Sequence, residues 1–229
     1  TTLRDGAQTE GISYSLGDKV RIVHQLDSLG ISYIEGGWPS NTKDRELFKA
    51  LSKKPLKNSK LVAFGSTRYP HKKVNLDANI KSLIGAGTAV VTIFGKTWDM
   101  HVQDVLKTTL DENLSMIYDS VSYLKSKGKE VFYDAEHFFD AFKSNQEYAL
   151  KALKTAQNAG ASVIILCDTN GGTLTSQLIE IIQQVKNNIN IALGIHTHND
   201  LDLAVANSIV AVQHGCTQIQ GTFNGLGER

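Results

Sequence analysis

The sequence has few cysteines, few prolines and no low-complexity or proline-rich linker. Its 229 residues include two cysteines and three prolines. Cys167 and Cys216 lie far apart without a Cys-x-x-Cys spacing, which argues against a disulfide framework or a zinc knuckle and is typical of a reducing cytosol. We therefore expect a cytoplasmic protein. Because no linker divides the chain, we expect residues 1–229 to form one domain.

A charge excess of either sign is also missing. The 24 lysines and arginines nearly balance 23 acidic residues, which leaves a formal net charge of +1. Such a chain has no basic field to attract nucleic acid or an anionic membrane, so we expect small-molecule partners. The most apolar stretches, such as 162–168, are too short to span a bilayer, and no secretory signal opens the chain.

Short apolar runs are what the sequence has instead, and they alternate with helical patterns. Each run is followed by polar residues or glycine, as in buried strands of a parallel sheet covered on both faces. The runs cover residues 31–37, 60–66, 89–95, 129–135, 162–168, 191–197 and 217–223. Helical periodicity is found in residues 22–29, 47–51, 114–124, 148–156, 178–185 and 203–210.

This alternation predicts a (β/α)8 TIM barrel, because the strand starts recur at about 25 to 40 residues, the length of one βα unit. TTLRD, residues 1–5, counts as the remaining end of a clipped first strand. No helical pattern follows the last run, so we expect a catalytic domain fragment without its final helix. An open doubly wound sheet would need a Gly-x-Gly-x-x-Gly turn, which LRDGAQTEG lacks.

Polar and charged residues gather where the predicted strands end. In a barrel these ends share one mouth, and catalytic residues lie there. The candidates are Arg4, Asp5, Glu35, Ser66, Thr67, Lys96, Asp134, Glu136, Asp168, Thr169, His196, His198 and Asn224.

His196 and His198 are the sharpest local feature. Residues two apart on a strand face the same side, so both imidazoles can reach one metal ion. The alternative is that they are two polar residues that cap a strand. Asp5, at another strand end, is the natural third ligand. Two imidazoles and one carboxylate leave open positions and suit Zn²⁺, Mn²⁺, Co²⁺ or Mg²⁺.

Arg4 lies directly beside this predicted ligand. A permanent cation there repels a metal ion, and its presence favours a reaction in which an anion develops. A surface arginine in a salt bridge is the alternative, which the position at a strand end disfavours.

Six motifs in this order resemble the DRE-TIM metallolyase family: LRDGAQ, IEGGWP, DAEHFFD, DTNGG, HTHND and GTFNGLGER. The similarity is greatest to its acyltransferase branch, which includes 2-isopropylmalate, homocitrate and citramalate synthases. IEGGWP and FYDAEHFFDAFKSN are most similar to the citramalate synthase subgroup. The lyase branch carries a cysteine in a glycine-rich loop after the eighth strand, which FNGLGER lacks.

The resemblance implies a transferase of branched-chain amino acid biosynthesis. Its reaction would be a metal-dependent Claisen condensation of acetyl-CoA with a 2-oxo acid, most closely pyruvate giving citramalate. Alternatives are 2-oxoisovalerate or 2-oxoglutarate, as in 2-isopropylmalate or homocitrate synthase; a dicarboxylate would need a basic residue such as Lys96. A non-catalytic metal- or metabolite-binding barrel is a more distant alternative.

The resemblance also implies roles for individual residues. Asp5, His196 and His198 would bind the divalent metal. Arg4 would bind substrate and stabilise the enolate or the new alkoxide.

Three further residues receive roles by the same resemblance. Glu136 would be a catalytic or metal-shell carboxylate, Thr169 would hold the carboxylate of the 2-oxo acid, and Glu35 would contact substrate. A lid, which supplies the general base to a neighbouring subunit, and regulatory regions are expected after residue 229. We therefore expect a homodimer in the full-length protein and slow turnover by the barrel alone.

Overall fold

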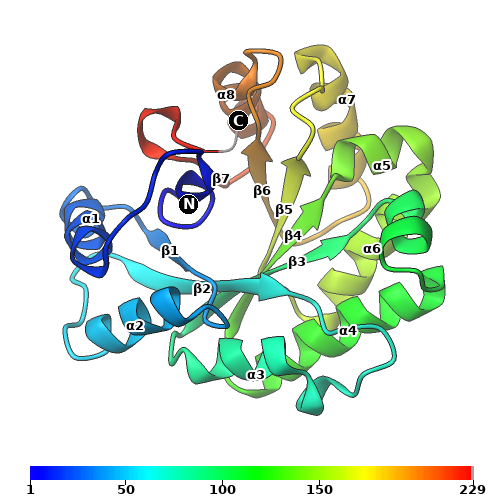
Figure 1. Ribbon diagram of the computed structural model, residues 1–229. Coiled ribbons are helices and arrows are strands. Elements are labelled where there is room, and N and C mark those ends of the chain that lie inside the picture. Colours follow the sequence, from blue (N-terminus) through cyan, green and yellow to red (C-terminus); the bar gives the residue numbers. More distant parts are fainter. Residues whose placement is uncertain (228–229) are drawn as a thin grey trace.

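A computed structural model describes residues 1–227; Glu228 and Arg229, the end of the GTFNGLGER motif, lie outside the described residues. Seven parallel strands form one curled sheet, and each pairs with its neighbours in sequence order (Figure 1). They are β1 (Tyr33–Gly37), β2 (Lys60–Ser66), β3 (Val90–Lys96), β4 (Glu130–Glu136), β5 (Val163–Asp168), β6 (Ala192–Thr197) and β7 (Gln218–Gln220).

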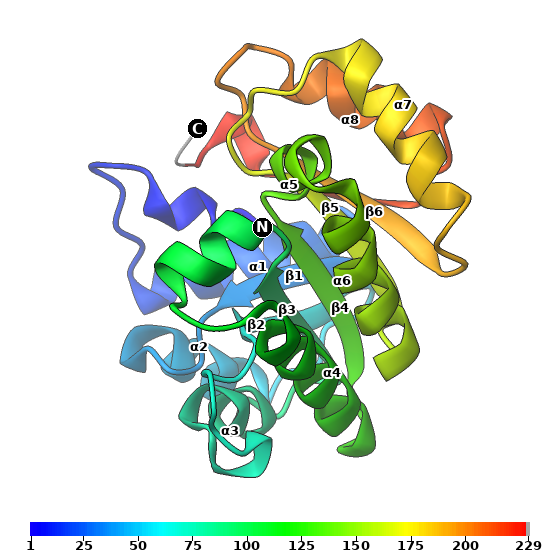
Figure 2. The same cartoon turned by 90° about the vertical axis from the view of Figure 1, so that its right-hand side faces the viewer.

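Helices lie around the outside of the sheet (Figures 1 and 2). They are α1 (Leu16–Ser28), α2 (Thr42–Leu51), α3 (Ala78–Gly85), α4 (Leu110–Ser126), α5 (Phe138–Ser144), α6 (Gln146–Ala159), α7 (Thr175–Lys186) and α8 (Ala204–Gln213). Shorter turns are η1 (Gly6–Gln8), η2 (Val74–Leu76), the π-helical η3 (His101–Val105) and η4 (Phe223–Gly225). Among the described residues, no helix has the length and apolarity needed to cross a membrane.

The predicted alternation of strands and helices is confirmed, but the prediction of a strand at TTLRD is wrong. The carbonyl of Thr1 accepts hydrogen bonds from the amides of Arg4 (3.0 Å) and Asp5 (2.9 Å), which bends this segment into a turn. Its backbone groups are therefore used locally and form no ladder with a neighbouring strand. The described sheet has seven strands, and β1 and β7 do not pair.

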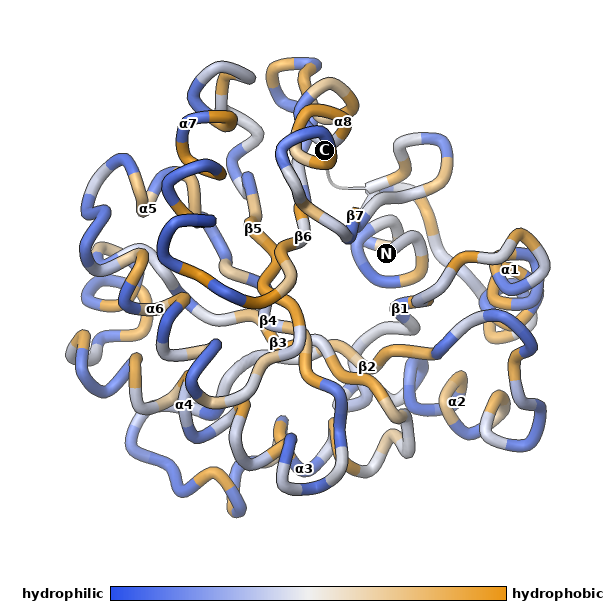
Figure 3. Tube along the Cα trace, turned by 180° about the vertical axis from the view of Figure 1, so that it is seen from behind, coloured by the Kyte–Doolittle hydropathy of each residue, from blue (hydrophilic) through white to orange (hydrophobic). Residues whose placement is uncertain are grey.

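The buried core has an inner and an outer layer. Between sheet and helices, a large cluster joins the outward side chains of the strands to the inner faces of the helices. Inside the curled sheet, Val62, Val90, Phe132, Ile165 and Cys167 pack together. Figure 3 shows hydrophobic residues along the strands and polar residues in the connecting loops. This inner layer leaves the end of the sheet at which the strands finish for polar residues.

The end of β1 shows how the backbone positions a residue at that upper end. Gly37 has φ +124°, and a Cβ there would lie 2.5 Å from Asp44 Oδ2, so glycine is required. The Asp44 carboxylate accepts a hydrogen bond from the Trp38 amide (2.9 Å) and forms a buried ion pair with Lys19. Trp38 is thereby held at the mouth of the sheet.

Candidate active site

A pocket of about 200 Å³ lies at the mouth, where the strands end. Most of the sequence-predicted candidates that carry charge line it. Its lining residues are Arg4, Asp5, Gln8, Trp38, Phe64, Phe94, Asp134, Glu136, Cys167, Thr169, His196 and His198. Because these residues come from the turn 1–5, from η1, and from β2 to β6 or the loops that follow β1 to β6, the fold alone brings them together.

Asp5, His196 and His198 meet in this pocket. One potential ligand atom from each of them lies within 4.8 Å of the others. The two imidazole rings are 5.2 Å apart between centroids, since His196 in β6 and His198 directly after β6 are two residues apart and face the same side. Asp5 and His196 are each only 7% exposed, so the group lies at the bottom of the pocket.

A hydrogen-bond chain orients the imidazole of His196. Gln220 Nε2 donates to Asp134 Oδ1 (2.9 Å), so the carbonyl oxygen of the same amide faces His196 Nδ1 at 2.8 Å. The Gln220 carbonyl oxygen can only accept, so the imidazole proton of His196 lies on Nδ1. The lone pair of His196 Nε2 then points away from Gln220. Burial, and then the charge of Arg4, lowers the pKa of His196 to about 4. The imidazole is therefore neutral at pH 7, the form that binds metals.

Arg4 lies in the same pocket between two carboxylates. Its Nε donates to Glu35 Oε2 at 2.7 Å, and its Nη1 lies 3.2 Å from Asp5 Oδ1. The guanidinium carbon is 3.9 Å from the centroid of the Phe64 ring, a cation–π contact. Burial opposes the charge of Arg4, but Glu35 and Asp5 outweigh burial and raise its pKa, so Arg4 remains a cation.

Glu35 lies behind Arg4, and the described pocket lining does not include it. Its carboxylate also accepts a hydrogen bond from the Thr1 hydroxyl. Burial raises the pKa of Glu35, but the charge of Arg4 counteracts burial and the net effect is a lowered pKa. An ionised Glu35 therefore holds the guanidinium in place.

The pKa of Asp134 is raised, whereas that of Glu35 is lowered. Asp134 is 3% exposed, and burial, followed by repulsion from Glu35, raises its pKa to about 8. At neutral pH the carboxyl group is mostly protonated. The mouth therefore avoids a third buried negative charge beside Asp5 and Glu35.

Glu136 and Thr169 form the opposite wall of the pocket. Glu136, the last residue of β4, pairs with Lys96 at the end of β3. The Thr169 hydroxyl oxygen accepts a hydrogen bond from the amide of His137 (2.8 Å), which fixes it after β5. Asp168 is not among the lining residues of the pocket. Its carboxylate stabilises the loop after β5 by accepting hydrogen bonds from the amide and the hydroxyl of Thr173.

Some predicted candidates lie outside the described lining of this pocket, and some lining residues were not predicted. Ser66, Thr67, Lys96 and Asn224 are not among the lining residues. Gln8 and the aromatic residues Trp38, Phe64 and Phe94 were missed. Gln220 was also missed, although it is in register with His196 on the neighbouring strand, a pairing that the alternation of β7 could have indicated.

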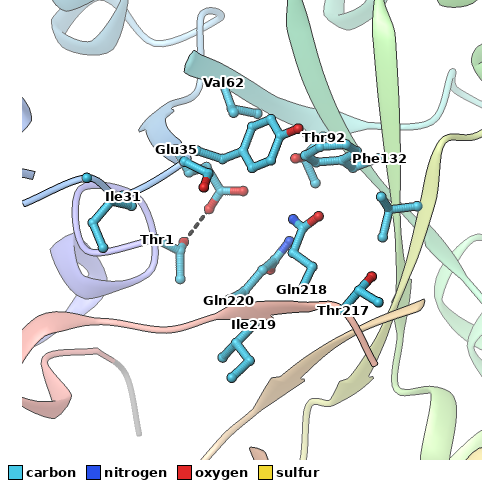
Figure 4. Close-up of a pocket in the computed structure, with 14 residues that line it drawn as sticks. Thr1, Ile31, Glu35, Val62, Thr92, Phe132, Thr217, Gln218, Ile219 and Gln220 are labelled. Carbon is cyan, nitrogen blue, oxygen red and sulfur yellow. Dashed lines mark hydrogen bonds between the residues drawn. The ribbon is translucent and has the colours of Figure 1, made fainter. Parts of the chain in front are cut away.

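The largest described pocket, about 500 Å³, lies elsewhere (Figure 4). It occupies the inside of the sheet between the unpaired β1 and β7, and its lining includes Thr1, Glu35, Gln218 and Gln220. Neither His196 nor His198 is among its lining residues. The chemistry of the candidate residues therefore belongs to the smaller pocket at the mouth.

Comparison with known proteins identifies the family of the whole chain. Residues 1–229 match the HMGL-like family. The chain is 58% identical over 231 residues to (R)-citramalate synthase of Aquifex aeolicus, an alignment that covers 100% of this chain and 44% of that protein. It is 35% identical over 234 residues to 2-isopropylmalate synthase 1 of Caldanaerobacter subterraneus, with 100% of this chain and 57% of that protein covered.

A solved structure shows the same fold. The HMG-CoA lyase of Brucella melitensis superposes with a TM-score of 0.81 at 16% identity, covering 99% of this chain and 80% of that chain. This likeness concerns the TIM-barrel fold alone. The chain spans about half the length of the curated relatives that it matches.

Replacing Asp134 tests the electrostatics of the mouth. In the unfolded chain this carboxyl ionises near pH 3.9, whereas the folded pKa is about 8, so the folded state binds more protons between these values. The contribution of Asp134 to the free energy of unfolding of the metal-free protein should therefore fall as pH rises from about 4 to 8, by at most roughly 1.4 kcal/mol per pH unit. Asp134→Asn should remove this contribution, so the slope of its unfolding free energy against pH, measured in urea over the same range, should be more positive than that of the wild type.

Asp111→Asn is the matched control, because the side chain of Asp111 is 93% exposed. It should retain the wild-type slope. Equal slopes for Asp134→Asn and the wild type would contradict a protonated Asp134 at neutral pH.

Proposed function

Because this chain belongs to the HMGL-like family, which it matches over residues 1–229, we propose that it forms the catalytic domain of a citramalate-synthase-type acyltransferase. The reaction is the condensation of acetyl-CoA with pyruvate. The observation that carries the proposal is Arg4, a cation held between two carboxylates beside Asp5, His196 and His198. The identity of 58% to an (R)-citramalate synthase supports the choice of reaction.

A divalent cation fits the donor set of Asp5, His196 and His198. The three potential ligand atoms lie within 4.8 Å of one another, and one imidazole is held by Gln220 with its Nε2 lone pair available. Two imidazole nitrogens and one carboxylate leave positions for substrate oxygens and suit Zn²⁺, Mn²⁺, Co²⁺ or Mg²⁺. When bound, such an ion polarises the ketone of the 2-oxo acid as a Lewis acid.

Arg4 stabilises the negative charge that develops on the ketone oxygen as the new carbon–carbon bond forms. Glu35 and Asp5 hold the guanidinium before substrate arrives, so no reorganisation is needed during the reaction. Glu35 therefore acts as a positioning residue and does not contact substrate. On the opposite wall, the Thr169 hydroxyl binds the carboxylate of the 2-oxo acid, and Glu136 holds a proton during transfer.

The size and charge of the pocket favour pyruvate over larger 2-oxo acids. Trp38, Phe64 and Phe94 pack against one another with centroids 5.0 to 5.8 Å apart and restrict the pocket to about 200 Å³. A branched side chain, as in 2-oxoisovalerate, would contact these rings. Lys96 is paired with Glu136, so it offers no charge for the second carboxylate of 2-oxoglutarate.

A non-catalytic binding barrel is the second candidate, and Arg4 argues against it. A cation 3.2 Å from a ligand carboxylate weakens metal binding and serves a purpose only when an anion forms nearby. With the reaction we also propose one catalytic domain over 1–229, a cytoplasmic homodimer and a role in branched-chain amino acid biosynthesis.

Chelation and substitution of Arg4 test the proposed reaction in the full-length protein. We expect CoA release from acetyl-CoA with pyruvate, loss of this activity with a chelator, and recovery on adding a divalent metal. Arg4→Ala should lower turnover by about 100-fold or more while metal stoichiometry stays unchanged, because Arg4 stabilises charge and does not ligate. His196→Ala should lower both turnover and metal stoichiometry.

His24→Ala serves as the control, because His24 is exposed on α1 and should change neither quantity. Full turnover by Arg4→Ala would remove Arg4 from the mechanism. Chelator-resistant turnover would remove the metal from it.

Phe94→Ala tests the aromatic restriction on substrate size. Removing this ring enlarges the pocket, so kcat/KM for 2-oxoisovalerate relative to pyruvate should rise by roughly tenfold or more. Steady-state kinetics with both acids measures the ratio. Tyr118→Ala, at a 49% exposed aromatic residue of α4, should leave the ratio unchanged. An unchanged ratio in an active Phe94→Ala enzyme would contradict the assignment of specificity to this wall.

A further inference from the structure

His137 joins β4 to α5 in a backbone conformation that residues other than glycine rarely adopt. Its φ is +54°, in the left-handed region, and it lies between Glu136, the last residue of β4, and Phe138, the first residue of α5. A non-glycine residue in this region costs free energy, and such residues concentrate at functional sites. The surrounding structure must therefore compensate for this conformation.

The burial of His137 separates it from the other non-glycine residues with a left-handed backbone. Those with a positive φ among residues 1–227 are His71, Lys107, His137, Asp202 and Asn224. The other four are exposed, whereas the His137 side chain is only 16% exposed. Because a largely buried residue at the end of a strand is held by its neighbours, the conformation of His137 is imposed by tertiary contacts.

Aromatic side chains supply these contacts. Phe138 and Phe139, which follow His137 directly, are fully buried, so α5 cannot shift without exposing both rings. In addition, the His101 ring packs edge-on against the His137 ring, with 4.5 Å between centroids, and the Trp98 ring lies 6.0 Å away. These contacts compensate for the strained backbone and fix the direction of the His137 amide.

Two links connect this turn to the loop after β5, and α5 lies against β5 (Figure 2). The His137 amide donates to the Thr169 hydroxyl oxygen at 2.8 Å. The Asp140 carboxylate, whose Oδ2 lies 3.7 Å from His137 Nδ1, accepts a hydrogen bond from Asn170 Nδ2 at 2.9 Å. Burial would raise the pKa of Asp140, but the His137 and Lys143 side chains outweigh burial and lower it, so this carboxylate is ionised. Thr169 and the residue after it are thus both tied to the turn.

We propose that His137 is a positioning residue, whose left-handed backbone holds the Thr169 hydroxyl where the carboxylate of the 2-oxo acid binds. This inference rests on the proposed function, which assigns that carboxylate to Thr169. His137 itself is not among the described lining residues of the pocket, so it acts through Thr169. A hydroxyl that is held in advance loses less entropy when substrate binds, so the turn raises the affinity for substrate without touching it.

Calorimetry of pyruvate binding to the zinc-loaded full-length protein tests this role without requiring turnover. His137→Val keeps the amide but disfavours the left-handed region, so it should weaken pyruvate binding by about fivefold or more. His137→Asn, which tolerates that region, should restore the affinity to within roughly twofold of the wild type. His71→Val makes the same change at an exposed residue with φ +59°, outside the pocket, and should change the affinity less than about twofold.

Thr169→Val separates positioning from a general loss of stability. If His137 acts through the Thr169 hydroxyl, His137→Val should cause no further loss of pyruvate binding in the Thr169→Val background. Thr169→Val should also speed hydrogen exchange at the His137 amide by about tenfold or more, because this amide loses its acceptor. Mass spectrometry of the exchanged protein measures this rate.

Wild-type pyruvate affinity in His137→Val, an equal loss in His71→Val, or additive losses in His137→Val and Thr169→Val would overturn the proposal. If His137→Val fails to fold, the exchange measurement decides, and an unchanged rate at the His137 amide would overturn it. Absence of pyruvate binding to the wild type would overturn both this role and the proposed function. The expected binding results in a protein without turnover would refute the proposed reaction and leave the positioning role standing.

Discussion

The ion pairs of Arg4 with Glu35 and Asp5 are the interaction around which the mouth of this barrel is arranged. Charges that are buried without partners cost several kcal/mol, so a guanidinium at this depth requires both carboxylates. One of these carboxylates also belongs to the group with His196 and His198. The same side chain therefore balances a permanent cation and offers a ligand atom, which couples charge stabilisation to the candidate metal centre.

The remaining polar groups follow from this arrangement. Because Glu35 is ionised to hold Arg4, a further carboxylate nearby is disfavoured, and Asp134 keeps its proton at neutral pH. Asp134 accepts a hydrogen bond from Gln220, whose amide in turn fixes the tautomer of His196. Replacing Glu35 should therefore change the protonation of Asp134 and, through the Gln220 amide, the hydrogen bonding of the His196 imidazole, which Glu35 does not contact.

Much of this arrangement could be predicted from the sequence, because parallel strands place their ends at one edge. That rule places His196 and His198 at the mouth of the barrel. Asp5 lies beside them as predicted, although its segment forms a turn and no strand. Two features could not be predicted from local sequence patterns. TTLRD has the composition of a strand end, yet its amides bond to the Thr1 carbonyl and form a turn. Gln220 carried no motif, and its role comes only from its register with β6.

X-ray absorption spectroscopy of the zinc-loaded full-length protein tests the central claim most directly. The account predicts scattering from two imidazoles together with oxygen ligands, and loss of one imidazole in His198→Ala. A zinc site without imidazole scattering, or one that is unchanged in that variant, would contradict a metal ion held by Asp5, His196 and His198 beside Arg4.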